Sequence, residues 1–480
     1  MNKRDWKLLY SSYSGMQKKA VDLVSAEVSK IICRDKGVYT LHVLACEKFS
    51  IGYDSNTNLI AVGLYEENPL AQRVADKSEI PENGYLIKVL DNPDAPNYKL
   101  AVITAKDERN LFYGAVDFTD DYLPSAAPHA GSNALRNPYD TFNEPLPDCR
   151  IASAPKAKTR SIFTWGHPIN DFQKFIENAA RLKFNQLIIW NDFLPLNAEE
   201  IVSYAHEYGL ELMWGFPWGW STDCGGTNLR ALDTLKEHIV SEFKKSCKGA
   251  GDGIYFQSFT ELNQERIDGV LIAEAVTGFV NDVSSALYAI DPDLRIQFGL
   301  HALSVREHIA FMEAVDPRIE IIWEDCGCFP YHYFPSTAAP EAMKETLEFT
   351  SRIVRLRNHG RTGLVYKGMM TMDWRKFVHQ AGPYVMGRAA RELIDNDLSM
   401  LTPMWRYFQT EWQQKGKYVW EFTRHIYDLT GGNVNLCLAG ALDGGLWYPL
   451  ALCAQLMWDS GEDYETIVRR VSNRPCVTMV

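Results

Sequence analysis

The stretch NQLIIWND at residues 185–192 is followed by EEIVSYAHEYG at 199–209 and by LELMWGF at 210–216. The first and third segments are short runs of leucine, aromatic and β-branched residues, a composition typical of buried strands. The middle segment repeats apolar residues at helical spacing. Together the three segments predict a strand, a crossover helix and a second, parallel strand.

This strand–helix unit recurs along the chain. Further strands are predicted at RSIFTWGH (160–167), GIYFQSFTE (253–261), RIQFGLHA (295–302), IEIIWEDCG (319–327), GLVYKG (363–368) and LSMLTPMW (398–405). Amphipathic helical stretches separate them, and eight such units match the repeat number and the length, about 250 residues, of a (β/α)₈ TIM barrel. A doubly wound open sheet is the alternative, but it usually has fewer strands and a Gly-rich first turn, which this sequence lacks.

Different patterns flank the barrel region. Residues 1–123 combine helical spacing over 20–32 with strand-like runs such as NLIAVGLY and KLAVITA, which predicts a small α/β domain. Residues 124–158 contain six prolines and are predicted to be a linker. The barrel is then assigned to 159–415 and a helical C-terminal region to 416–480.

Composition narrows the function classes. The chain of 480 residues has 49 Lys and Arg against 61 Asp and Glu, a net charge of −12, which argues against a nucleic-acid partner. No apolar run approaches the roughly 18–20 residues of a membrane helix, so no membrane partner is predicted. The first residues lack the apolar core of a secretory signal, and the ten cysteines form no disulfide framework. These features predict a cytoplasmic protein, although removal of a signal would leave the same pattern. A homo-oligomer is compatible with the sequence.

Polar and aromatic residues gather where the predicted strands end, and the C-terminal ends of barrel strands are where active sites form. In strand order, the candidate residues are His167, then Trp190 with Asp192, then Trp218 and Trp220, then Glu261, then His301, then Trp323 with Glu324 and Asp325, then Lys367 and Asp373, and finally Arg406. The opposite ends of the strands show no similar enrichment. Polar residues also collect wherever a strand meets a loop, but that explains one or two of these positions better than the whole set.

Side-chain alternation sharpens three positions. Glu261 alternates in step with Gln257, and His301 alternates in step with Gln297, while apolar residues occupy the other face of each strand. Because the apolar face meets the surrounding helices, the polar set is expected to point to the barrel axis, with Glu261 and His301 as neighbours at the mouth. On the sixth strand the same rule turns Glu324 inward.

Two carboxylates across a barrel mouth are what cleavage of a glycosidic bond requires, because one donates a proton and the other attacks or activates water. Glu261 lies beside the apolar Phe259 and Leu262 and suits the general acid, since apolar neighbours raise a carboxyl pKa. Glu324 or Asp325 suits the second role. A salt bridge that ties the rim together is the structural alternative.

The other candidates are predicted to bind substrate. Trp190, Trp218, Trp220 and Trp323 offer flat rings on which the apolar face of a sugar can stack. The remaining binding residues are polar or charged and would contact hydroxyl groups or a substrate carboxylate: His167, Asp192, His301, Lys367, Asp373 and Arg406. A lysine at the mouth favours an acidic sugar.

No metal or cofactor is predicted. Cys326 and Cys328 could form a zinc site with Cys224 and His332, but Cys-x-Cys lacks the usual two-to-four-residue spacing and a second pair. The sequence also has no Gly-x-Ser-x-Gly elbow, no P-loop and no dinucleotide fingerprint.

The segment ERNLFYGAVDF at 108–118 carries a family resemblance. With its surrounding α/β domain it resembles the non-catalytic N-terminal domain of family 20 β-hexosaminidases, which also precedes a (β/α)₈ barrel. Family 84 hexosaminidases and family 67 α-glucuronidases share that layout. The usual form is Gly-Leu-x-Tyr-Gly, and this chain has Asn110 for the first Gly while it keeps Tyr113 and Gly114.

The resemblance implies that Glu261, at the end of the fourth strand, is the general acid. Family 20 enzymes carry an Asp-Glu pair there, in which the Asp orients the acetamido group of the substrate, whereas this chain has Thr260 before Glu261. The paired Asp residues of family 84 are also missing. In α-glucuronidases a strand-four Glu acts with later carboxylates, which is similar to Glu261 with Glu324 and Asp325, although the family's longer motif does not follow Glu261.

The sequence is therefore interpreted as a divergent, exo-acting glycoside hydrolase for a small oligosaccharide or glycoside, either β-N-acetylhexosaminidase-like or α-glucuronidase-like. Two alternatives remain open. One is a non-catalytic carbohydrate-binding protein on the same scaffold, and the other is a barrel lyase or isomerase.

Overall fold

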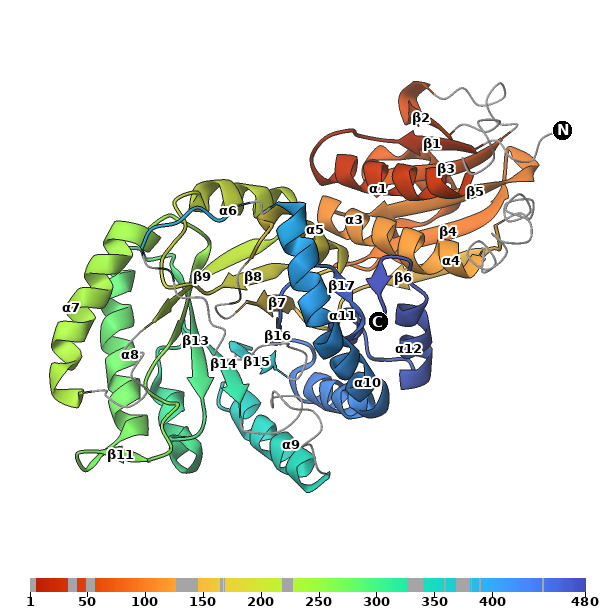
Figure 1. The fold of residues 1–480 in the computed structure, drawn as a ribbon. Helices are drawn as coiled ribbons and strands as arrows, with labels where there is room; N and C mark the ends of the chain where they lie inside the picture. Colours follow the sequence, from red (N-terminus) through yellow and green to blue (C-terminus); the bar gives the residue numbers. More distant parts are fainter. Residues whose placement is uncertain are drawn as a thin grey trace. The chain divides into compact units, whose positions relative to one another are not determined.

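The computed structural model describes residues 6–32, 41–48, 57–126, 146–164, 167, 169–217, 228–325, 340–357, 360–367, 380, 382–387, 390–442 and 444–480, with the backbone alone at 31–32, 48, 216–217, 325, 340, 342 and 397–398. The chain divides into two compact units (Figure 1). The first contains residues 1–155 and 468–477, and the second contains residues 156–467 and 478–480.

The first unit is a six-stranded sheet covered by helices on both faces. Its strands lie in the order β2-β1-β3-β5-β4-β6. Their bounds are β1 Trp6–Tyr10, β2 Leu41–Ala45, β3 Asn58–Leu64, β4 Tyr85–Asn92, β5 Ala95–Ala105 and β6 Cys149–Ser153. The helices are α1 Gly15–Ile32, α2 Pro69–Val74, α3 Glu108–Asp117 and α4 Leu123–Ala126. The predicted α/β domain is present, and the range 124–158 assigned to a linker contains β6, which pairs antiparallel with β4.

Helix α3 holds the segment that resembles the hexosaminidase domain, and its sequence explains how closely it packs. A Cβ at Gly114 would lie 3.1 Å from Tyr85 Cβ and 3.2 Å from Ile103 Cγ2, so glycine lets the helix approach the sheet. Asn110, which replaces the family's first glycine, is buried and donates through Nδ2 to Asp107 Oδ2 at 2.6 Å. Asp107 Oδ1 in turn accepts the Asn110 backbone N–H at 2.9 Å and caps the helix.

The C-terminal segment 468–477 completes the first unit. Arg474 is buried and donates to both carboxylate oxygens of Asp121, through Nε at 2.6 Å and through Nη2 at 2.8 Å. Cys476 Sγ lies 3.2 Å from Asp120 Oδ2. This end of the chain, predicted to be helical, therefore shares the buried polar cluster of the N-terminal domain.

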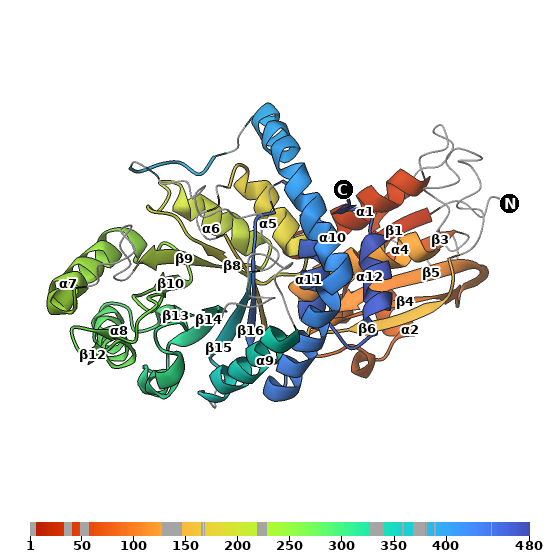
Figure 2. The same ribbon diagram turned by 60° about the horizontal axis from the view of Figure 1, so that its bottom comes forward.

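The second unit is a closed barrel of eight parallel strands, which confirms the predicted TIM-barrel fold (Figures 1 and 2). In sequence order the strands are β7 Thr159–Phe163, β8 Gln186–Ile189, β9 Glu211–Pro217, β10 Gly253–Gln257, β13 Arg295–His301, β14 Glu320–Asp325, β15 Thr362–Tyr366 and β16 Asn435–Ala439. The helices of the unit are α5 Phe172–Arg181, α6 Ala198–Glu207, α7 Leu232–Glu242, α8 Ile272–Tyr288, α9 Pro340–Arg355, α10 Arg391–Thr430 and α11 Tyr448–Trp458, and α12 Tyr464–Ser472 continues into the first unit. Short strands are β11 Arg266–Ile267, β12 Val270–Leu271, β17 Leu446–Trp447 and β18 Val477–Thr478.

The eighth strand is not where the sequence predicted it. Residues 398–405 belong to the long helix α10, and the barrel closes instead with β16, which pairs with β15 and β7. The apolar residues of that region follow helical spacing, since Trp405, Phe408 and Trp412 are buried on one face of α10. The barrel therefore extends beyond residue 415.

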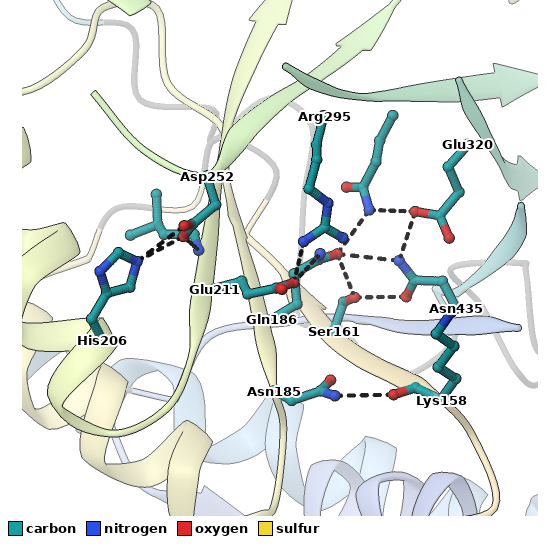
Figure 3. A network of polar contacts seen from close by, with 12 residues as sticks. Lys158, Ser161, Asn185, Gln186, His206, Glu211, Asp252, Arg295, Glu320 and Asn435 are labelled. Carbon is teal, nitrogen blue, oxygen red and sulfur yellow. Dashed lines mark hydrogen bonds and ion pairs between the residues drawn. The ribbon is translucent and has the colours of Figure 1, made fainter. Parts of the chain in front are cut away.

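Inside the barrel, the side chains form three layers. The floor, at the N-terminal ends of the strands, is polar, so the expectation that these ends are not similarly enriched in polar residues is wrong. Figure 3 shows Ser161, Gln186, Glu320 and Asn435 of the floor, joined by hydrogen bonds. The middle layer is apolar and buried and consists of Phe163, Ile188, Trp190, Met213, Tyr255, Ile322, Val365, Cys437 and Ala439. The third layer lies at the C-terminal ends of the strands.

Glu320 makes the stability of the floor dependent on pH. Loss of hydration raises the pKa of this carboxyl group, although Gln297 Nε2 donates to its Oε2 at 2.6 Å. Because the folded pKa is raised, the folded state holds the proton more tightly, and the stability gained at low pH is lost as pH rises through the folded pKa. We expect Glu320→Gln to increase the unfolding free energy relative to wild type at pH 8 more than at pH 4. Urea unfolding at both pH values measures this, and an equal difference at the two would contradict it.

No helix among the described residues is long and apolar enough to cross a membrane.

Candidate active site

Four polar side chains meet at the C-terminal end of the barrel. Gln257 ends β10, His301 ends β13, Glu324 lies next to the end of β14, and Lys367 directly follows β15. All four are buried, with between 0% and 2% of each residue exposed. The sequence predicted three of them as site residues, and the structure brings these three together.

Glu324 is the centre of this group. Its Oε1 accepts hydrogen bonds from Tyr255 Oη at 2.5 Å and from Gln257 Nε2 at 2.5 Å. Its Oε2 lies 3.3 Å from His301 Nε2 and 3.3 Å from Lys367 Nζ. One oxygen of this buried carboxylate thus has two hydrogen-bond donors, and the other lies beside a lysine.

Glu324 continues the inward alternation of Glu320 and Ile322, and a β-bulge at this point leaves it without a partner residue on β13. In the register of β13 and β14, Leu300 pairs with Trp323 but His301 pairs with Asp325, so Glu324 is the additional residue. Bulges of this kind redirect side chains and are frequent beside active sites. The predicted inward direction of Glu324 is confirmed, since it contacts residues of β10 and β13.

Sequence reasoning missed two residues beneath this carboxylate. Tyr255 is fully buried in the apolar layer and contributes only its hydroxyl group to Glu324. Gly299, at the middle inward position of β13, leaves the space that both groups occupy, because a Cβ there would collide with Glu324 Oε1 and Tyr255 Oη. The alternation that singled out Gln257 and His301 also includes these positions, two residues earlier on each strand.

Glu261 lies beyond the strand from which its direction was predicted. β10 ends at Gln257, and Glu261 follows in the next loop, where it is partly exposed. That loop is held at the end of β13: Thr260 Oγ1 accepts the His301 backbone N–H at 3.2 Å, and Thr260 O accepts Ser304 Oγ at 2.7 Å. The predicted proximity of Glu261 to His301 is therefore supported at the level of the backbone, while alternation alone does not orient its side chain.

Two predicted binding residues lie on loops at the same end of the barrel. The His167 backbone N–H donates to Thr164 O at 3.1 Å just after β7. Asp192 is exposed after β8 and accepts the Gln380 backbone N–H at 2.8 Å through Oδ2. Asp192 therefore anchors another segment, and neither residue is among the contacts of Glu324.

Three predicted substrate contacts, Trp190, Trp323 and Arg406, lie elsewhere than the sequence suggested. Trp323 is fully buried and faces outward, where its ring packs on Phe349 of α9 with centroids 5.1 Å apart. Trp190 is buried in the apolar layer. Arg406 is exposed on α10, and because no strand precedes it, the reason for placing it at the mouth is lost. The prediction is wrong for Trp323, whose ring belongs to the helix–strand core.

The remaining candidates cannot be placed. Trp218, Trp220 and Asp373, and the alternative metal ligands Cys224, Cys326, Cys328 and His332, lie outside the described residues, as does the side chain of Asp325. Within the part of the chain that the structure describes, no three His, Cys, Asp or Glu side chains are grouped as a metal ion would require.

Comparison with known proteins shows a relation of fold. No protein-family model matches the sequence, and no curated protein matches it significantly. Among solved structures, CpGH84B has a TM-score of 0.51 and 12% identity, with 97% of this chain and 70% of that chain covered. BtGH115A, described as a family GH115 4-O-methyl-α-glucuronidase with specificity for decorated arabinogalactans, has a TM-score of 0.51 and 13% identity, with 98% and 58% covered. CpGH84D has a TM-score of 0.38 and 11% identity, with 67% of this chain and 52% of that chain covered.

Proposed function

We propose that this protein is a glycoside hydrolase in which Glu324 is the ionised carboxylate and Glu261 the general acid. The observation that carries the proposal is the buried Glu324 carboxylate at the C-terminal end of a barrel, with Lys367 Nζ and His301 Nε2 each 3.3 Å from one oxygen. Active sites of this fold lie at that end. Burial of an ionised group is costly, and function is the usual reason for retaining it.

The two carboxyl groups differ in the way the reaction requires. Glycoside cleavage develops positive charge on the sugar ring while the leaving oxygen takes a proton. In this proposal the carboxylate of Glu324 stabilises the ring or attacks it, directly or through water. Glu261 is partly exposed and lies on a loop fixed to β13. In this proposal it protonates a leaving group that extends toward solvent.

The α-glucuronidase-like subclass fits this site better than the hexosaminidase-like one. Thr260 stands where family 20 enzymes have an acetamido-orienting Asp, and its hydroxyl oxygen already accepts the His301 backbone N–H. Lys367 supplies a buried cation beside Glu324, which suits an acidic sugar. BtGH115A, whose structure has a TM-score of 0.51, is described as a 4-O-methyl-α-glucuronidase. We therefore propose a terminal uronide or a related small glycoside as substrate.

A panel of 4-nitrophenyl glycosides tests the function directly. We expect release of nitrophenol from at least one glycoside, with the α-D-glucuronide the first to examine, and no requirement for an added metal ion. Sugar binding measured by calorimetry without release from any glycoside would favour the carbohydrate-binding alternative. Turnover that appears only with added metal, or that yields an isomerised or eliminated sugar, would favour the lyase or isomerase alternative.

A further inference from the structure

We propose that Tyr255, Gln257 and Gly299 position Glu324 so that its Oε1 is held by hydrogen bonds within the protein and only Oε2 takes part in the reaction. We call these three residues the cradle. The catalytic part of the inference rests on the proposed function, whereas the cradle itself does not. None of the three is a catalytic residue in this view, because each acts on Glu324 and not on the substrate.

The hydrogen bonds divide the two oxygens. Oε1 accepts from Tyr255 Oη and from Gln257 Nε2, both at 2.5 Å, which uses both lone pairs of that oxygen. Oε2 instead faces His301 Nε2 and Lys367 Nζ. His301 ends β13 and Lys367 follows β15, so Oε2 faces two nitrogen groups of the site, whereas Oε1 faces Gln257 and the hydroxyl of Tyr255 from the apolar layer.

Tyr255 is a rigid donor. Its ring lies in the apolar layer, with centroids 5.0 Å from Phe163 and 6.1 Å from Trp190. The Tyr255 side chain is fully buried, and packing of this kind limits the positions that its hydroxyl group can take. Glu324 thus receives one of its hydrogen bonds from a group that the barrel core holds in place.

Gly299 makes the arrangement possible. Any side chain at this position would overlap Glu324 Oε1 and Tyr255 Oη, so the two groups could not meet. The glycine is therefore a positioning residue of the site, because the absence of a side chain lets the Glu324 carboxylate contact the Tyr255 hydroxyl group.

Other titratable groups also lie around the carboxylate of Glu324. Among the residues that the structure describes, the titratable groups that face Glu324 are Tyr255 from β10, His301 from β13, Lys367 after β15 and Cys437 from β16. Burial, with the charge of Glu324 as a further cause, raises the pKa of the Cys437 thiol, so this cysteine stays neutral. Loss of the Tyr255 hydroxyl removes a hydrogen bond to the ionised form and should make protonation of Glu324 easier.

The test is a titration that does not depend on activity. In protein labelled with ¹³C-carboxyl glutamate, the resonance absent from Glu324→Gln identifies Glu324. We expect Tyr255→Phe to move its titration midpoint up by about 1–2 pH units, the size expected for one charge-assisted hydrogen bond. Tyr366→Phe is the matched control, because Tyr366 is an equally buried tyrosine of the barrel whose hydroxyl pairs with Thr423 Oγ1 at 3.0 Å. The same midpoint in Tyr255→Phe and wild type would overturn the cradle.

Kinetics on any substrate that the wild type cleaves give a second measurement. Tyr255→Phe should move the acidic limb of the kcat/KM profile to higher pH and lower kcat about 10- to 100-fold with little change in KM. Gly299→Ala should lower kcat further, whereas Gly278→Ala, on an exposed position of α8 with no atom near the new Cβ, should not. If the wild type cleaves nothing, the proposed function fails, and the titration still decides the cradle. A normal titration with an unchanged pH profile would reject the inference while the proposed function stands.

Discussion

Glu324→Gln is expected to lower kcat/KM by about 10³-fold or more and to leave the protein folded. The substitution keeps the shape of the side chain but removes the negative charge that would stabilise the developing positive ring or act on the anomeric carbon. Losses of this order or larger follow removal of a group that acts in the transition state. The measurement is steady-state turnover of the best aryl glycoside, with the thermal transition as a check on folding.

Glu320→Gln is the matched control for this experiment. Glu320 lies on the same strand, four residues earlier, and also faces the barrel interior, but it bonds Gln297 and Asn435 in the floor. The two variants therefore make the same chemical change at opposite ends of one strand. If Glu324→Gln loses activity and Glu320→Gln keeps it, the reaction takes place at the C-terminal end of the barrel. Near-native activity in Glu324→Gln would reject this carboxylate as a catalytic group.

The sequence predicted the barrel because the strand–helix pattern recurs along the chain. Seven of the eight predicted strands coincide with observed ones, since a buried parallel strand is a short apolar run that needs little context. The eighth failed because LSMLTPMW is also apolar, and an apolar run in a buried helix face looks the same over eight residues. The true strand, NLCLA, follows Gly431 and Gly432 and precedes Gly440, and those glycines were the available signal.

The candidate site was predictable where alternation applies and not beyond it. Alternation correctly turned His301 and Glu324 inward, since both lie within strands. It could not orient Glu261, which follows the strand end, and it could not reveal the bulge at Glu324, which depends on the register with β13. Gly299 is informative only once the atoms across the barrel are known, because a missing side chain leaves no chemical signal in a sequence.

Glu261→Gln should show a loss that depends on the leaving group. If Glu261 donates the proton, its removal should cost about 10²- to 10⁴-fold for alkyl glycosides, whose leaving oxygen must be protonated. A 2,4-dinitrophenyl leaving group departs as a stable anion, so cleavage of that glycoside should change little. The rate of bond cleavage is to be compared for both substrates in the variant and in the wild type.

Glu265→Gln provides the control, because Glu265 lies on the same loop and pairs with His308 at 3.4 Å. That variant should resemble the wild type with every leaving group. An equal loss for alkyl and dinitrophenyl glycosides in Glu261→Gln would mean that Glu261 binds the sugar or stabilises the loop and that another group supplies the proton. The Thr260 hydroxyl oxygen accepts the His301 backbone N–H and so ties this loop to the end of β13. A purely structural role of Glu261 would therefore also lower the thermal transition of the variant. Proton donation instead predicts a normal transition and a steep dependence on the leaving group.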